Sequence, residues 1–242
     1  MSANFLSLPS ELRNKIYEQV LVDQESIDPF TLSYLRPLTP ELLRTNSTVC
    51  REASSLLYAQ NHFDFATCDF EFVVSFVDQI DRNNANHIRH IRIDFPDIPN
   101  LGRHDVTLGN NSTRILAKIR SDCINLNTLT TSLGSTNAMA LDGLGNPDLV
   151  VEALALVDAG FRTISSLQMI IVEVYNDELS VDIRRKIESH GWTISITEQA
   201  EESDIDRAFS DIEDDGDRYD DDNGDYHYDI DDDSDFWRRA AD

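Results

Sequence analysis

The sequence lacks a basic stretch and a long apolar run, and each absence excludes a class of function. Nucleic-acid binding needs clustered lysine and arginine that displace counterions from phosphates, whereas this 242-residue chain carries a formal net charge of −25. The same charge disfavours an anionic membrane surface, and no segment approaches the roughly 20 apolar residues of a membrane span. We therefore expect neither nucleic acid nor membrane as a partner.

Cysteine and catalytic motifs are also sparse. The three cysteines, Cys50, Cys68 and Cys123, are far apart and form no CxxC pair, which is typical of a reducing compartment. The N-terminal residues show no signal-peptide pattern, so we expect a cytoplasmic or nuclear protein. Without a glycine-rich phosphate loop, a metal-ligand spacing or a nucleophile with a base, the sequence predicts no cofactor, no metal site and no catalytic residues.

What is present is a strong division of charge along the chain. Residues 198–242 hold 20 Asp and Glu against four Arg, a net charge of −16, whereas residues 1–197 carry −9 and nearly all the aliphatic side chains. So polar a segment cannot bury a core, and we expect 198–242 to be a disordered acidic tail. We divide the rest into a helical segment, 1–61, and an α/β domain, 62–197.

Apolar periodicity predicts alternating helices and strands after residue 61. Helices are expected at 9–21, 39–60, 70–80, 112–123, 148–159 and 180–190, and strands at 62–65, 88–95, 126–133, 167–175 and 192–197. The connections are long enough for crossovers, so we expect an α+β fold with a mostly parallel, irregular repeat-like sheet. The strand at 167–175 is apolar enough to be central and covered on both faces.

Two N-terminal segments carry the most specific pattern. Residues 8–18 read LPSELRNKIYE, and residues 42–63 read LLRTNSTVCREASSLLYAQNHF. The first resembles the LPxELxxxI opening of F-box domains. Together they resemble F-box-like proteins of filamentous fungi, in which LPxELRxxIY is followed by LLRxxxxxxxEAxxLLYxxNxF.

The resemblance implies a non-enzymatic adaptor that recruits a protein substrate to a cullin–RING ubiquitin ligase. F-box domains dock on the Skp-type subunit of the ligase, while a C-terminal domain binds the substrate. The positions that match the docking motif, or the apolar positions of a later F-box helix, are Leu8, Pro9, Leu12, Ile16, Val49 and Cys50. We also expect Arg13 and Glu52 to pair as a weakly stabilising surface salt bridge.

Three other interpretations of the chain stay open. The apolar positions of the helical segment are equally consistent with simple packing onto the α/β domain. A second alternative is a protein-binding scaffold with no ligase role, in which the acidic tail attracts a basic protein and Ser203 and Ser210 are phosphorylation candidates. The third is an enzyme with a site near Asp94–Asp97, where a strand ends, as ligand sites of α/β folds often do.

Overall fold

The computed structural model describes residues 4–29, 40–66, 68–99, 106–133, 147–175 and 179–197. Within these ranges the fold is α+β with a five-stranded sheet. The helical elements are η1 (Phe5–Ser7), α1 (Ser10–Leu21), η2 (Pro40–Arg44), α3 (Ser47–Gln60), α4 (Phe70–Gln79), α5 (Asp81–Ala85), α6 (Asn110–Asp122), α8 (Pro147–Arg162) and α9 (Val181–Ser189). The strands are β1 (His62–Phe65), β2 (His90–Asp94), β3 (Thr128–Leu133), β4 (Met169–Tyr175) and β5 (Thr193–Thr197).

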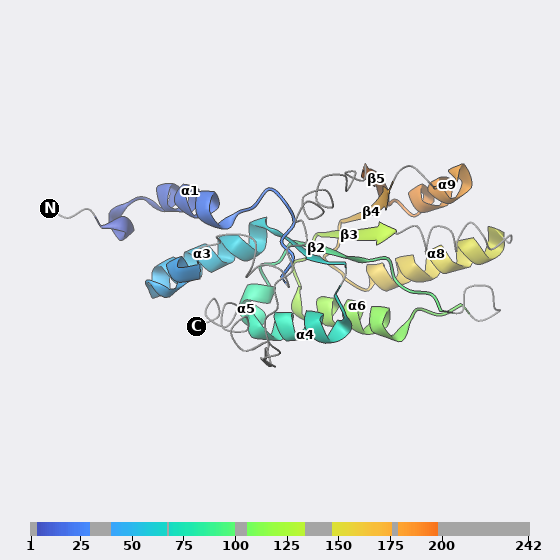
Figure 1. Cartoon of the computed structure of the whole chain (residues 1–242), viewed down its shortest axis with the longest axis horizontal. Helices are drawn as coiled ribbons and strands as arrows, with labels where there is room; N and C mark the ends of the chain where they lie inside the picture. Colours follow the sequence, from blue (N-terminus) through green and yellow to red (C-terminus); the bar gives the residue numbers. More distant parts are fainter. Residues whose placement is uncertain are drawn as a thin grey trace, which may run out of the picture.

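The sheet is parallel throughout, and its strands follow the order of the chain, β1-β2-β3-β4-β5. Figure 1 shows α4, α5, α6 and α8 on one side of the strands. This arrangement follows from the strand order. The crossovers have one handedness, and each leads to the next strand in the same direction along the sheet, so their helices lie on one face. The sheet is therefore wound in a single direction.

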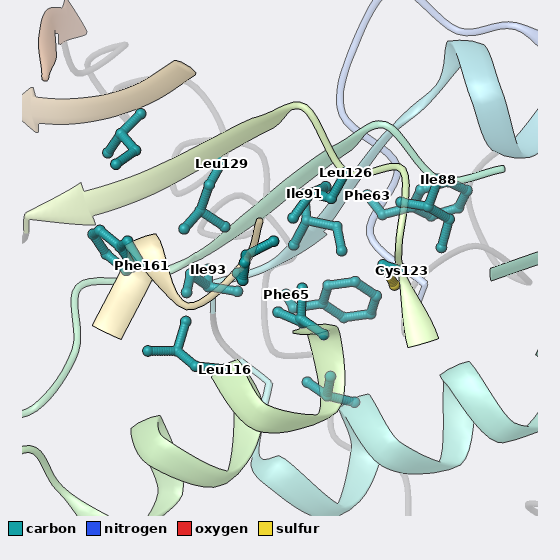
Figure 2. Packing of buried hydrophobic residues seen from close by; sticks show 14 of the residues in the cluster. Phe63, Phe65, Ile88, Ile91, Ile93, Leu116, Cys123, Leu126, Leu129 and Phe161 are labelled. Carbon is teal, nitrogen blue, oxygen red and sulfur yellow. The ribbon is translucent and has the colours of Figure 1, made fainter. Parts of the chain in front are cut away.

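The helix-facing side of the sheet forms the core. Phe63 on β1, Ile91 on β2 and Leu129 on β3 are register partners or neighbours, and none is more than 2% exposed. Figure 2 shows these side chains with Phe65 and Ile93 on the side of the sheet where the helices carry Leu116 and Phe161. One continuous hydrophobic cluster runs from Tyr17 in α1 to Trp192 before β5, so segment 1–61 and the α/β layer share a core.

The opposite face of the sheet is polar and partly open. Arg92 on β2 donates to Asp64 Oδ2 on β1 at 2.6 Å and to Glu173 Oε2 on β4 at 2.7 Å. His62 and His90 stack at the end of the same face, with ring centroids 4.4 Å apart. Parallel sheets are usually covered on both sides. Arg92 neutralises part of the charge of the two carboxylates, and the charged side chains allow this face to contact solvent.

One sequence expectation about β4 is confirmed and one is wrong. The strand is an interior one, paired with β3 and β5, but its burial alternates: Ile170 and Val172 are buried, whereas Met169 is 50% exposed. Its apolar run suggested cover on both faces, but among the described residues the helices α4, α5, α6 and α8 lie on one side of the strands.

Two expected helices also differ from those observed. The helix expected at 39–60 divides into η2 and α3, because Asn46 caps α3 by accepting a hydrogen bond from the Thr48 N–H at 2.8 Å. The helix expected to stop at Gly160 continues to Arg162. Gly160 allows close packing instead, since a Cβ there would lie 3.2 Å from methyl carbons of Leu108 and Leu116.

Candidate partner-binding site

Helix α1 is held against α3 by an ion pair between the two sequence motifs. Arg13 Nε donates to Glu52 Oε2 at 2.8 Å and Arg13 Nη2 to Glu52 Oε1 at 2.5 Å. The third nitrogen, Nη1, donates to the backbone oxygen of Leu8 at 2.6 Å. The expected pair is present, but it is largely sequestered: the side chain of Arg13 is 12% exposed and that of Glu52 is 26% exposed.

Tyr17 completes this contact from the next turn of α1. The residue is fully buried, and its hydroxyl donates to Glu52 Oε2 at 3.1 Å. Hydrogen bonding from Arg13 lowers the pKa of Glu52 below its ordinary 4.5, while burial raises the pKa of the Tyr17 hydroxyl. Glu52 is therefore ionised and fully engaged at neutral pH.

Asn61 fixes the other ends of the same two helices. Its side chain is buried, with Nδ2 donating to the backbone oxygens of Leu21 at 2.7 Å and Leu57 at 2.8 Å. Its Oδ1 accepts from the Asp23 N–H at 2.8 Å. Three backbone groups at the C-terminal ends of α1 and α3 thus depend on one amide. Figure 1 shows the two helices side by side, to the left of the strands.

With this face of α1 fixed, an adjacent face presents apolar side chains to solvent. Leu12 is 47% exposed, Ile16 41% and Val20 38%, each one helical turn from the next. Leu6, in η1, is 37% exposed. We call Leu12, Ile16 and Val20 the α1 stripe. The structure does not use Leu12 and Ile16 to pack the helical segment onto the α/β layer.

The remaining positions matched to the docking motif have different surroundings. Leu8 is half-buried and Pro9 is exposed at the start of α1. Val49 is 4% exposed and belongs to the core, so its side chain is not available to a partner in this structure. Cys50 is half-buried, with its Sγ 3.9 Å from Ser54 Oγ. Of the six positions, only Pro9, Leu12 and Ile16 present strongly exposed side chains.

Sequence reasoning did not assign two of the residues that shape this site. The apolar spacing placed Val20 in the same stripe as Leu12 and Ile16, but Val20 lies outside the LPxELxxxI motif and was not counted as a docking position. Asn61 lies within the second motif, between the exposed Gln60 and His62, and no sequence pattern indicated its role. Most of that motif is structural: Leu57, Tyr58 and Phe63 are fully buried, and the rings of Tyr58 and Phe63 stack at 5.8 Å.

A second candidate site lies at the carboxyl ends of β1, β2 and β3. A pocket of about 400 Å³ opens there, beside the first turns of α4 and α6. It is the location expected for a site near Asp94–Asp97, and both carboxylates line it. Partial desolvation raises the pKa of Asp94, with a further increase from Asp64 and an opposing effect of Arg92.

The pocket also contains a thiol, Cys68. Burial raises its pKa to about 12, and four nearby carboxylates act in the same direction. The thiol is therefore protonated at neutral pH and is a weak nucleophile.

The remaining expectations concern metals, membranes and the acidic tail. Within the six described ranges, no group of His, Cys, Asp or Glu is arranged to hold a metal ion. None of the helices in those ranges has both the length and the apolar character to traverse a bilayer. Ser203, Ser210 and the rest of 198–242 lie outside the described residues.

No protein-family model, curated protein or solved structure matches this chain. The resemblance to F-box domains therefore rests on the residues quoted above.

Proposed function

We propose that this chain is a non-enzymatic F-box-like adaptor that docks a Skp-type subunit through the α1 stripe. One observation carries the proposal: the LPxELRxxIY motif forms a helix whose Leu12, Ile16 and Val20 face solvent. A row of apolar side chains at helical spacing is a common docking element for a partner groove. The α/β domain would then bind the protein to be ubiquitinated.

The way α1 is held supports this assignment. Its inner face is fixed by Arg13, Tyr17 and the contacts of Asn61, so the stripe is presented without support from the partner. A helix that is already ordered loses little conformational entropy on docking. The outer polar positions Glu11, Lys15 and Gln19 are all exposed and flank the stripe.

Pull-down and calorimetry with a purified Skp-type subunit test the proposal. The double variant Leu12→Asp/Ile16→Asp should fold, because both side chains are exposed, and should lose binding. Burying two such side chains contributes roughly 3 kcal/mol or more, so the affinity should fall about 100-fold. The matched control, Lys15→Asp/Gln19→Asp, adds two carboxylates to the same helix off the stripe and should retain most of the binding. Absence of wild-type binding at high micromolar concentrations would refute the ligase role.

A scaffold without a ligase role is the alternative, and the partly open sheet face favours it. Affinity purification of the full chain and of a chain lacking residues 198–242 separates the two. The adaptor should retain ligase subunits after the deletion and lose only basic partners. A scaffold should bring down no ligase subunit in either form.

A further inference from the structure

The pocket at the carboxyl ends of β1–β3 has a distinct combination of charge and apolar lining. Phe65, Phe70 and Ile115 supply apolar walls, while Asp94, Asp97 and Ser132 supply polar groups. Its volume of about 400 Å³ suits one long side chain of a ligand and is small for a folded element.

The negative charge in this pocket is only partly compensated. Asp94 makes no hydrogen bond or ion pair with any other described residue. The nearest cation on its strand, Arg92, pairs with Asp64 and Glu173. Asp97 lines the pocket as well, and its side chain is exposed. A cation entering the pocket would therefore gain two carboxylates that ion pairs within the described residues do not occupy.

Ser132 adds a polar group to the wall of the pocket. The residue is 7% exposed and lines the pocket from the end of β3. Its hydroxyl makes no hydrogen bond within the described residues, although its backbone oxygen accepts from the Phe95 N–H at 3.0 Å. A ligand in the pocket would bring a polar group within reach of this hydroxyl.

An anion fits the pocket poorly, although two helices begin there. The N-terminus of α4 is capped by Asp69, whose carboxylate accepts from the Phe72 N–H at 2.8 Å. At the start of α6, the Asp97 carboxylate lies close to Gly109, since a Cβ on Gly109 would be 3.1 Å from Asp97 Oδ2. Both positive helix ends already face carboxylates, which would repel a phosphate.

We propose that this pocket is the substrate-recognition site of the adaptor and that it binds a lysine or arginine side chain of a partner protein. The cationic head meets Asp94 and Asp97, the Ser132 hydroxyl accepts one of its N–H groups, and the aliphatic stem packs against Phe65, Phe70 and Ile115. The pocket adjoins the open sheet face, where Asp64 and Glu173 outnumber Arg92. A basic segment of the partner therefore fits the surroundings as well as the pocket.

The proposal rests on the proposed function for its biological meaning, but its test does not involve the ligase. Fluorescence anisotropy measures binding of short labelled peptides to the full-length chain alone. Three peptide pools carry lysine, arginine or norleucine at a fixed central position, and N-acetyl-lysine amide serves as the free side chain. The lysine or arginine pool should bind more tightly than the norleucine pool, and added salt should weaken the difference.

Variants of the pocket locate the binding. Asp94→Asn/Asp97→Asn should reduce the affinity for the cationic peptides at least about tenfold. Ser132→Ala should reduce that affinity less, as expected for loss of one hydrogen bond. The matched control Asp182→Asn/Glu188→Gln removes two exposed carboxylates from α9 and should leave the affinity unchanged. Attraction to the acidic tail is the same in all these chains and cancels in the comparison.

Three results would overturn the proposal. The norleucine pool could bind as tightly as the lysine and arginine pools, or the Asp94→Asn/Asp97→Asn chain could bind the cationic peptides as tightly as wild type does. The third is stronger binding of the free lysine amide than of any peptide. The Leu12→Asp/Ile16→Asp chain should bind the peptides as wild type does. Failure of the docking function and failure of this recognition site therefore give different results.

Discussion

Arg13 and Glu52, which lie 39 residues apart, form a bidentate ion pair that sets the orientation of α1 on α3. The pair lies on the inner face of α1, so it determines which side chains of the helix remain outside. The α1 stripe depends on this contact although none of its residues takes part in it.

Replacement of Arg13 should therefore reduce docking without altering the docking surface. Arg13→Met keeps the length of the side chain but leaves Glu52 without its cation, and α1 should become less protected in hydrogen exchange. Affinity for a Skp-type subunit should fall even though Leu12, Ile16 and Val20 are intact. Arg13→Lys should recover only part of the affinity, because an ammonium group does not reproduce the forked contact. If the Arg13→Met chain kept the wild-type hydrogen exchange in α1 and the wild-type affinity for the Skp-type subunit, the ion pair would not position the helix.

The same pair predicts how stability depends on pH. The pKa of Glu52 is lower in the folded chain than its ordinary 4.5, so its contribution to stability is complete above about pH 4.5. That contribution is lost as the pH falls through the lower pKa of the folded state. Urea denaturation should show the largest stability difference between wild type and Glu52→Gln near neutral pH, and a shrinking one below pH 4.5. A constant difference would mean that the charge of Glu52 contributes nothing.

Asn61→Ala should destabilise the chain more than an ordinary polar substitution. It leaves the Leu21 oxygen and the Asp23 N–H without their side-chain partner, and the Leu57 oxygen keeps only its bond from the backbone N–H of residue 61 at 3.4 Å. A buried unsatisfied group costs about 1–3 kcal/mol, so we expect a loss of roughly 3 kcal/mol in the free energy of unfolding. Asn125→Ala is the matched control: Asn125 is exposed and also donates to a backbone oxygen, that of Asn86 at 2.8 Å. It should cost less than about 1 kcal/mol.

Asp94→Asn should raise the stability of the chain at neutral pH. Because the pKa of Asp94 is higher in the folded state than its ordinary 3.8, the ionised carboxyl opposes folding at neutral pH. The gain from Asp94→Asn should disappear as the pH falls through the raised pKa. Thermal melts of both chains across acidic pH measure the effect, with Asp182→Asn, a carboxylate on α9 outside the pocket, as the control. A loss of stability at pH 7 would instead show that Asp94 supports the fold.

The sequence predicted most of the elements and the parallel sheet, because their apolar spacing is local information. It did not predict that the described helices α4, α5, α6 and α8 all lie on one side of the strands. The apolar side chains of β4 are typical of a strand covered on both sides. Which face the helices cover depends on the order of the strands, and that order is a property of the whole chain. The division between η2 and α3 was missed because Thr39-Pro40-Glu41 is itself a good helix start, whereas the competing cap at Asn46 acts through one hydrogen bond.

The candidate sites were predictable to different degrees. The spacing of Leu12 and Ile16 shows that they share a face of α1, but not whether that face is buried; the answer depends on Arg13 and Glu52 meeting across 39 residues. Asp94 and Asp97 were identifiable from the strand end. Ser132 was not, because only the register of β2 with β3 brings it beside Asp94.

The two edges of the sheet are protected in different ways. Ile27 pairs with β1 from outside, accepting from the Asp64 N–H at 2.8 Å and donating to the His62 oxygen at 2.7 Å, so that edge is closed by the helical segment. At the other edge, β5 has an exposed Ile196 and is followed directly by residues 198–242 with their net charge of −16. Two copies that approached through β5 would bring two such segments together. Like charge of this size opposes such an approach.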